Sequence, residues 1–179
     1  MIKEEIFPIV DESGIAIGSA SRKDCHSGTF LLHPVVHLHV FDKRGRLFLQ
    51  HRSLLKDIQP GKWDTSVGGH IDYGEEVIDA LFREAREELG LQSIQPIFLY
   101  TYINRTDKEA EYVNTFATVC EPSEIIIDNN EITDGRFFDM SEIEPLLGTG
   151  YFTPNFELEF QKLKDNQSLL VEHFDIRQC

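Results

Sequence analysis

The sequence predicts an α+β fold in which β-strands and helices are interleaved along the chain. Short apolar and β-branched segments indicate strands, whereas residues 75–89 follow the 3.6-residue period of a helix. No internal repeat, linker or low-complexity segment separates these elements, and 179 residues are enough for one well-packed core. We therefore expect a single domain over residues 1–179.

The first half of the chain is predicted to contain two β-hairpins. Residues 5–11 and 15–20 are strand candidates joined by a turn at Ser13-Gly14. Residues 35–41 and 46–50 flank a glycine-containing loop, which is typical of a second hairpin.

The second half begins with the most regular helical segment of the chain. Residues 75–89 are expected to form this helix, which Gly90 would end. Four strand candidates follow, at residues 97–103, 112–120, 125–127 and 136–138. Two short helices, at residues 141–147 and 154–164, are expected within a C-terminal helical tail over residues 141–179.

The charge and composition exclude several classes of partner. Seventeen Lys and Arg against thirty-one Asp and Glu give a net charge of -14, which would repel a long nucleic acid. A small phosphorylated ligand is compatible with this charge, because divalent cations can screen a cluster of carboxylates. No run of 18 apolar residues predicts a membrane span, and three widely spaced cysteines favour a cytoplasmic location.

Three glutamates are predicted to share one strip of the long helix. Glu84, Glu87 and Glu88 fall within about 100° on a helical wheel. They could be ordinary surface residues, with Arg83 pairing to Glu87. However, crowded carboxylates are also suitable ligands for Mg²⁺ or Mn²⁺. The strip expected to pack on the sheet consists of Ile78, Leu81, Phe82, Ala85 and Leu89.

Residues 69–91 resemble the Nudix box. The box has a glycine, five residues, a glutamate, seven residues and an Arg-Glu pair, followed by an apolar residue, any residue, two glutamates, any residue, a glycine and an apolar residue. Every position is filled here, although Ala85 is smaller than the usual aliphatic residue. The resemblance implies a Nudix fold, with a mixed β-sheet sandwiched between α-helices (α/β/α). It also implies cleavage of a nucleoside diphosphate linked to another group, X.

The same resemblance assigns the expected metal ligands. Glu84, Glu87 and Glu88 would bind Mg²⁺ or Mn²⁺, with help from the carbonyl oxygen of Gly69. The metal would act as a Lewis acid on the phosphoryl oxygens and lower the pKa of a bound water.

Other residues are expected to orient these ligands or to accept a proton. Glu75 and Arg83 would hold the helix and its flanking loop through hydrogen bonds. The general base is either Glu84, inside the box, or Glu131, in a loop before a strand candidate; for Glu131 a surface role is an equal alternative.

A narrower resemblance, covering most of the chain, is to the branch of Nudix-fold proteins that contains type I isopentenyl-diphosphate isomerase. It implies an N-terminal β extension over residues 1–33. It also implies a second candidate metal site, for which simple polar pocket residues are the alternative. This site comprises His26, His33, His70, Glu109 and Glu111.

One departure from the isomerases favours hydrolysis. The isomerases carry a cysteine two residues before the histidine that follows the box glycine, whereas Gly68 occupies this position here. The sequence therefore predicts a hydrolase of a small-molecule diphosphate, with isomerisation and non-catalytic nucleotide or sugar binding as the alternatives. A homodimer is also expected from the family. His37 and His39 alternate on a strand candidate and are interpreted as structural residues.

Overall fold

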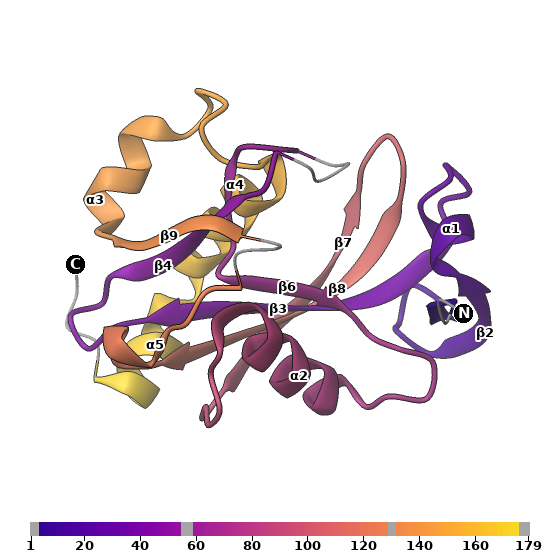
Figure 1. Cartoon of the computed structure of the whole chain (residues 1–179), viewed down its shortest axis with the longest axis horizontal. Helices are drawn as coiled ribbons and strands as arrows, with labels where there is room; N and C mark the ends of the chain where they lie inside the picture. The colour runs from indigo at the N-terminus through magenta and orange to yellow at the C-terminus, as the bar shows by residue number, and fades with distance from the viewer. Residues whose placement is uncertain (1–3, 55–58, 129–131, 176–179) are drawn as a thin grey trace.

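The computed structural model describes residues 4–54, 59–128 and 132–175. At one end of the molecule, β1 (Ile6–Val10) pairs antiparallel with β2 (Ala16–Ser21), and the one-turn helix α1 (Arg22–Cys25) follows (Figure 1). Phe7, Ile9 and Cys25 form a small core beneath this hairpin. The predicted N-terminal hairpin and β extension are therefore confirmed.

The main sheet is mixed and contains seven strands in the described part of the chain. Five strands follow the order β5-β4-β3-β8-β7, while β6 pairs with β3 and β9 pairs with β4. The strands are β3 (Leu32–Phe41), β4 (Leu47–Arg52), β5 (Trp63–Asp64), β6 (Val67–His70), β7 (Ile97–Arg105), β8 (Ala110–Val119) and β9 (Ile132–Phe138).

The central strand β3 is buried along its whole length. It pairs in parallel with β8 over ten positions, and its other edge pairs with β6 at residues 35–38. The predicted strands and their antiparallel turn are present, but the pairing of β3 with β4 is short, since it is limited to Phe41 and Leu47. The strand β6 occupies the edge that β4 would need, so β4 instead pairs with β9.

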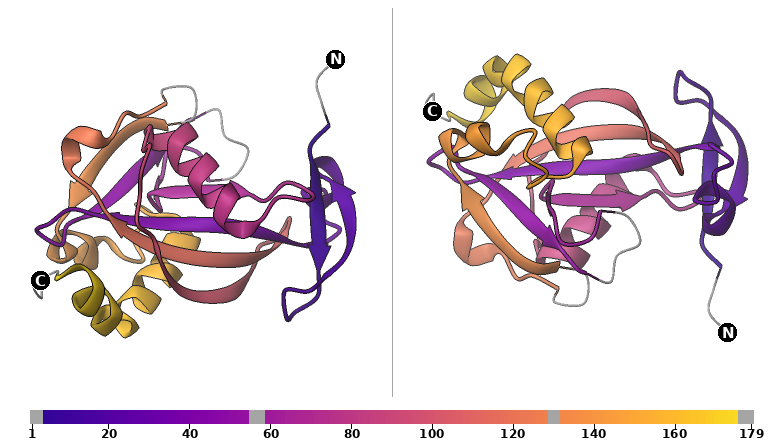
Figure 2. Two further views of the ribbon diagram at one scale, coloured as in Figure 1. Left: turned by 90° about the horizontal axis from the view of Figure 1, so that it is seen from below. Right: turned by 90° about the horizontal axis from the view of Figure 1, so that it is seen from above.

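Helices cover both faces of the sheet, which confirms the predicted α/β/α arrangement. The helix α2 (Val77–Leu89) lies on one face, while α4 (Pro154–Asp165) and α5 (Gln167–Phe174) lie on the other (Figure 2). None of the helices within the described ranges is long and apolar enough to cross a membrane. The remaining short helices are η1 (Pro122–Glu124), α3 (Met140–Ile143) and η2 (Glu144–Leu146).

Two local predictions are wrong for identifiable reasons. Residues 125–127 do not form a strand, because the backbone amides of Ile126 and Asp128 donate to the carbonyl oxygens of Leu89 and Glu88 at the end of α2. The helix expected at residues 141–147 is divided into α3 and η2, and Pro145, which lacks an amide hydrogen, lies at the start of η2.

The buried face of α2 also differs from the predicted one. Ile78 and Phe82 are 41% and 38% exposed, so they do not pack in the core. Glu88 is buried instead, because its carboxylate accepts hydrogen bonds from the sheet. The buried residues of the helix are Ala80, Leu81, Ala85, Glu88 and Leu89.

Candidate functional site

Arg83 joins α2 to the loop that precedes it. Its guanidinium donates two hydrogen bonds of 2.8 Å to the carboxylate of Glu75 and one of 2.9 Å to the carbonyl oxygen of His70. The backbone amide of Asp72 donates to the same Glu75 carboxylate at 3.0 Å. The hydrogen bond from Arg83 is the main reason that the pKa of Glu75 is lowered. Glu75 and Arg83 thus connect helix and loop by the hydrogen bonds that the Nudix resemblance implies.

The three box carboxylates lie in two different environments. Glu84 and Glu87 both accept from Nη1 of Arg83, at 2.6 and 3.4 Å, and their side chains are 14% and 57% exposed. Glu88 lies between two strands, where its Oε2 accepts from Nε2 of Gln50 on β4 at 3.1 Å and from the amide of Gly68 on β6 at 3.3 Å. The carboxylate of Glu88 therefore bridges β4 and β6.

The carboxylate of Glu84 lies directly against the backbone of Gly69. A Cβ atom added at Gly69 would overlap the carboxyl carbon and Oε1 of Glu84. Only glycine therefore permits this close approach, which brings the Gly69 backbone next to a carboxylate, as expected for two ligands of one cation.

Replacing Gly69 by alanine is expected to displace the Glu84 carboxylate and weaken its ion pair with Arg83, which should lower the free energy of unfolding by roughly 0.5–1 kcal/mol. Urea unfolding monitored by circular dichroism would measure this loss. The matched control is Gly18→Ala on β2, where an added Cβ meets no atom within 4 Å. Equal stability of the two variants would contradict the proposed contact.

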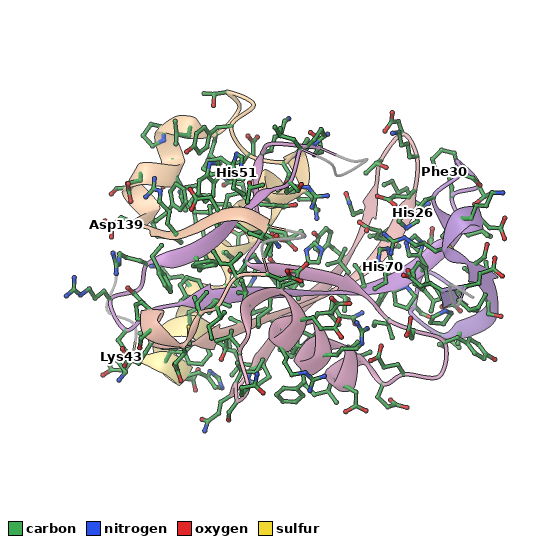
Figure 3. All side chains as sticks on the ribbon, in the orientation of Figure 1. His26, Phe30, Lys43, His51, His70 and Asp139 are labelled. Carbon is green, nitrogen blue, oxygen red and sulfur yellow. The ribbon has the colours of Figure 1, made fainter. Side chains whose placement is uncertain are left out.

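Three histidines from distant parts of the chain converge beside the N-terminal hairpin. One ring nitrogen from each of His26, His33 and His70 lies within 4.8 Å of the others. Nε2 of His26 and Nε2 of His70 are 3.1 Å apart, and Figure 3 shows these two side chains close together. The ring of Phe7 on β1 stacks on His70 with centroids 4.4 Å apart. The hairpin therefore helps to position the histidines.

Two glutamates complete this cluster. One ligand atom from each of His33, Glu109 and Glu111 also lies within 4.8 Å of the other two. Nδ1 of His26 is 3.4 Å from Oε2 of Glu109, and Glu111 accepts from Asn104 at 2.9 Å. The structure thus brings together the five residues of the second candidate site, which we call the His/Glu cluster.

The buried polar atoms of the His/Glu cluster suit a divalent cation. Among the described residues, the buried Nε2 of His33 has no hydrogen-bond partner, and the buried Oε2 of Glu109 has only its 3.4 Å contact with Nδ1 of His26. Burial lowers the pKa of His70 well below its usual value, which keeps its imidazole neutral and able to bind a metal. Burial, assisted by the charge of Glu111, raises the pKa of Glu109 to about 7. A bound cation would accept the lone pair of His33 and would stabilise the charged form of Glu109.

The box glutamates and the His/Glu cluster are connected through β6. Successive side chains of a strand point to opposite faces, so the Gly69 backbone contacts Glu84 near α2, while His70 points toward His26 and His33. The candidate base Glu131 lies outside the described residues.

A buried network on the α4 side of the sheet was not recognised from the sequence. Nδ1 of His37 is 2.8 Å from Oε1 of Glu159, whose side chain is fully buried in α4. Thr65 donates to the other oxygen of Glu159 at 2.5 Å. A signal was present, since Glu159 shares a helix face with Phe156, Phe160 and Leu163, all of which are buried. An acid at such a position requires partners.

Known proteins similar to this chain also carry a Nudix domain. The model of the NUDIX domain matches residues 31–155, more than half of the chain. An uncharacterized Nudix hydrolase of Streptomyces coelicolor is 32% identical over 167 residues, which cover 90% of this chain and 89% of that protein. The isopentenyl-diphosphate Delta-isomerase of Brevibacterium linens is 31% identical over 178 residues, which cover 94% and 95% of the two chains.

Solved structures show the same fold at lower identity. A Deinococcus radiodurans protein superposes with a TM-score of 0.76 and 22% identity, covering 88% of this chain and 98% of that one. The Nudix domain of Shewanella oneidensis NrtR, solved with ADP ribose, has a TM-score of 0.62 and 13% identity over 75% of this chain and 87% of that one. From the box, the fold and these relatives, we conclude that the chain belongs to the Nudix family.

Proposed function

We propose that this protein is a divalent-metal-dependent hydrolase that cleaves an organic diphosphate, such as a nucleoside diphosphate linked to another group. The proposal depends mainly on the complete box, in which Glu84 and Glu87 converge on Arg83 and Glu84 lies against Gly69. These oxygen donors suit Mg²⁺ or Mn²⁺, which bind carboxylates and phosphate oxygens together.

When bound, the metal would neutralise phosphoryl oxygens and lower the pKa of a water molecule. The residues of the chain have separate tasks in this proposal. Glu84, Glu87 and Glu88 hold the metal, with the Gly69 carbonyl as a further ligand. Arg83 is a positioning residue, because its guanidinium is engaged by Glu75 and the box glutamates. Glu84 or Glu131 accepts the proton of the attacking water.

We also propose that the His/Glu cluster binds a second divalent cation. His33 belongs to two groups of three residues whose ligand atoms lie within 4.8 Å of one another, one with His26 and His70 and one with Glu109 and Glu111. The buried Nε2 of His33, which has no hydrogen-bond partner among the described residues, supports this assignment. A cation there would add positive charge close to the box, which an anionic substrate needs in a protein of net charge -14.

The second candidate function is isomerisation of isopentenyl diphosphate, and it is supported by the His/Glu cluster and by the names of several relatives. Gly68 argues against it, because no thiol is present at the position where the isomerases have one. The two cysteines in the described ranges, Cys25 and Cys120, are buried, and burial raises the pKa of both thiols.

A panel of diphosphates assayed with and without Mg²⁺ or Mn²⁺ tests these functions. The panel should contain nucleotide sugars, ADP-ribose, dinucleoside polyphosphates, oxidised nucleotides and isopentenyl diphosphate. We expect metal-dependent release of a phosphorylated product from at least one compound, and no turnover after chelation with EDTA. Deuterium uptake from solvent into an allylic diphosphate would instead show isomerisation. Tight nucleotide binding without turnover of any compound would indicate a non-catalytic binding protein.

A further inference from the structure

On the α4 side of the sheet, a row of polar residues extends from the His/Glu cluster along β3 to His37. His33 and His37 share one face of β3, because they are four residues apart, whereas Val36 and Leu38 on the opposite face pack with α2. In the adjacent strand β6, His70 pairs with Val35 and Gly68 pairs with His37. His37 therefore lies one pleat, roughly 7 Å, beyond His70 along the sheet.

Beside His37, the sheet surface at Gly68 carries no side chain and is open. Gly68 is exposed, although it lies in the sheet between buried Val67 and half-buried residues. A Cβ atom added at Gly68 would have the ring of His37 as its nearest neighbour, with Nε2 at 3.3 Å and Cδ2 at 3.4 Å. The edge of this imidazole thus borders the space above the glycine. The isomerases, by resemblance, would have a cysteine side chain in this space.

The other edge of His37 is held by Glu159. Nδ1 lies 2.8 Å from Oε1 of Glu159, and the His37 side chain is only 10% exposed. The hydroxyl of Tyr102 donates to the same Oε1 at 2.8 Å. Within the described ranges, by contrast, Nε2 of His37 has no hydrogen-bond partner. Nδ1 therefore carries a proton that faces Glu159, and Nε2 is the atom available to a ligand.

Electrostatics favour a cationic imidazole at this position. Burial by itself would lower the pKa of His37, but the charge and hydrogen bond of Glu159 outweigh burial and raise this pKa to about 9. Glu111 and Asp64 act in the same direction. Asp64 itself is paired with Arg52 at 2.9 Å. The neighbouring His39 stays neutral, because burial lowers its pKa to about 4.

We propose that His37 and the space above Gly68 form a phosphoryl-binding subsite, in which Nε2–H of the imidazolium donates to a non-bridging oxygen of the substrate diphosphate. This inference rests on the proposed function, because it takes the ligand to be a diphosphate. A charge-assisted hydrogen bond from a largely buried cation is strong and directional. The separation of one pleat from His70 allows one phosphoryl group to meet His37 while its neighbour lies toward the His/Glu cluster.

The subsite also explains why a histidine and a glutamate are buried together in this position. A purely structural pair would be expected to satisfy both ring nitrogens inside the protein. Here one nitrogen is bonded to Glu159 and the other faces an opening. The role of Glu159 is that of a positioning residue, which fixes the ring and maintains its charge.

The test is a titration of the Mg²⁺-loaded protein with methylenediphosphonate, a diphosphate analogue that cannot be hydrolysed at its bridge. Imidazole ¹⁵N–¹H spectra report on Nε2 of His37 directly. We expect a saturable shift of this resonance. In His37→Gln and in Gly68→Ala, whose new methyl group fills the space, the Kd should rise about 10-fold or more. Gly68→Ala keeps the test valid if His37→Gln does not fold.

The control variant is Gly18→Ala, which adds a methyl group to an open position on β2 and should leave the Kd unchanged. If the His37 resonance does not move, or if Gly68→Ala binds the analogue as tightly as the control, the subsite is refuted even when hydrolysis is observed. If the resonance shifts but no diphosphate of the panel is hydrolysed, the proposed function fails while the subsite stands.

Discussion

Glu87→Gln is expected to lower kcat by roughly 10²–10³-fold, since a metal ligand contributes several kcal/mol of transition-state stabilisation. The carboxylate is replaced by an amide of the same shape, which is a poor ligand for Mg²⁺. Because the Glu87 side chain is 57% exposed, its free energy of unfolding should change little. Steady-state kinetics at saturating Mg²⁺, on the best substrate of the panel, would measure the effect.

The control for this experiment is Glu76→Gln. Glu76 precedes α2, is exposed and makes no capping hydrogen bond through its side chain. Its replacement changes the net charge by the same amount without altering the box, so kcat should stay close to the wild-type value. Turnover of Glu87→Gln at the control rate would show that Glu87 is not a metal ligand.

Glu159→Gln is expected to lower the free energy of unfolding by about 3 kcal/mol at pH 6, because it leaves the buried His37 without its counter-charge. The loss should narrow as the pH rises. In the wild type, the raised pKa of His37 stabilises the folded state fully below the ordinary value of 6.5, and this contribution disappears as the pH approaches about 9. The variant lacks this contribution at every pH.

The partner group has the opposite pH dependence. Burial would raise the pKa of Glu159, but the charge and hydrogen bond of His37 lower it to about 2. Its contribution is therefore present above pH 4.5 and disappears as the pH falls toward 2. Urea unfolding of wild type and Glu159→Gln at pH 3, pH 6 and pH 9 would measure both slopes. Parallel curves would exclude an ionised pair, and the exposed Glu172→Gln serves as the control.

The hydrogen bonds within the box could be predicted because its residues are close in the sequence. Glu75 and Arg83 are eight residues apart, and a loop followed by a helix brings them into contact without help from the rest of the chain. The helix end at Gly90 was equally local, since this residue adopts the left-handed conformation that glycine favours. Such features depend on interactions between residues that are near each other in the sequence.

The His/Glu cluster was suggested only by resemblance. His26 and His70 are separated by 44 positions, and their 3.1 Å contact depends on the N-terminal hairpin packing against the end of β6. No periodicity in the sequence encodes this packing, because it results from long-range strand pairing.

The short pairing of β3 with β4 has the same origin. Pairing along the whole of both strands was the simplest local solution, but β6 takes the edge of β3 and leaves Glu88 to bridge β4 and β6. Burial of Glu88 in turn determines which face of α2 meets the sheet, so Ile78 and Phe82 remain exposed. Competition between distant strands for one edge cannot be read from either strand alone.

The sequence by itself determined the family and predicted which carboxylates would hold a metal, because the box is one continuous segment. Only the tertiary structure decided that His37 and Glu159, 122 positions apart, form a buried pair beside Gly68. The physical reason is that a contact between a strand and a helix distant in the sequence depends on how the whole core packs, and the spacing of residues in the sequence does not predict this packing.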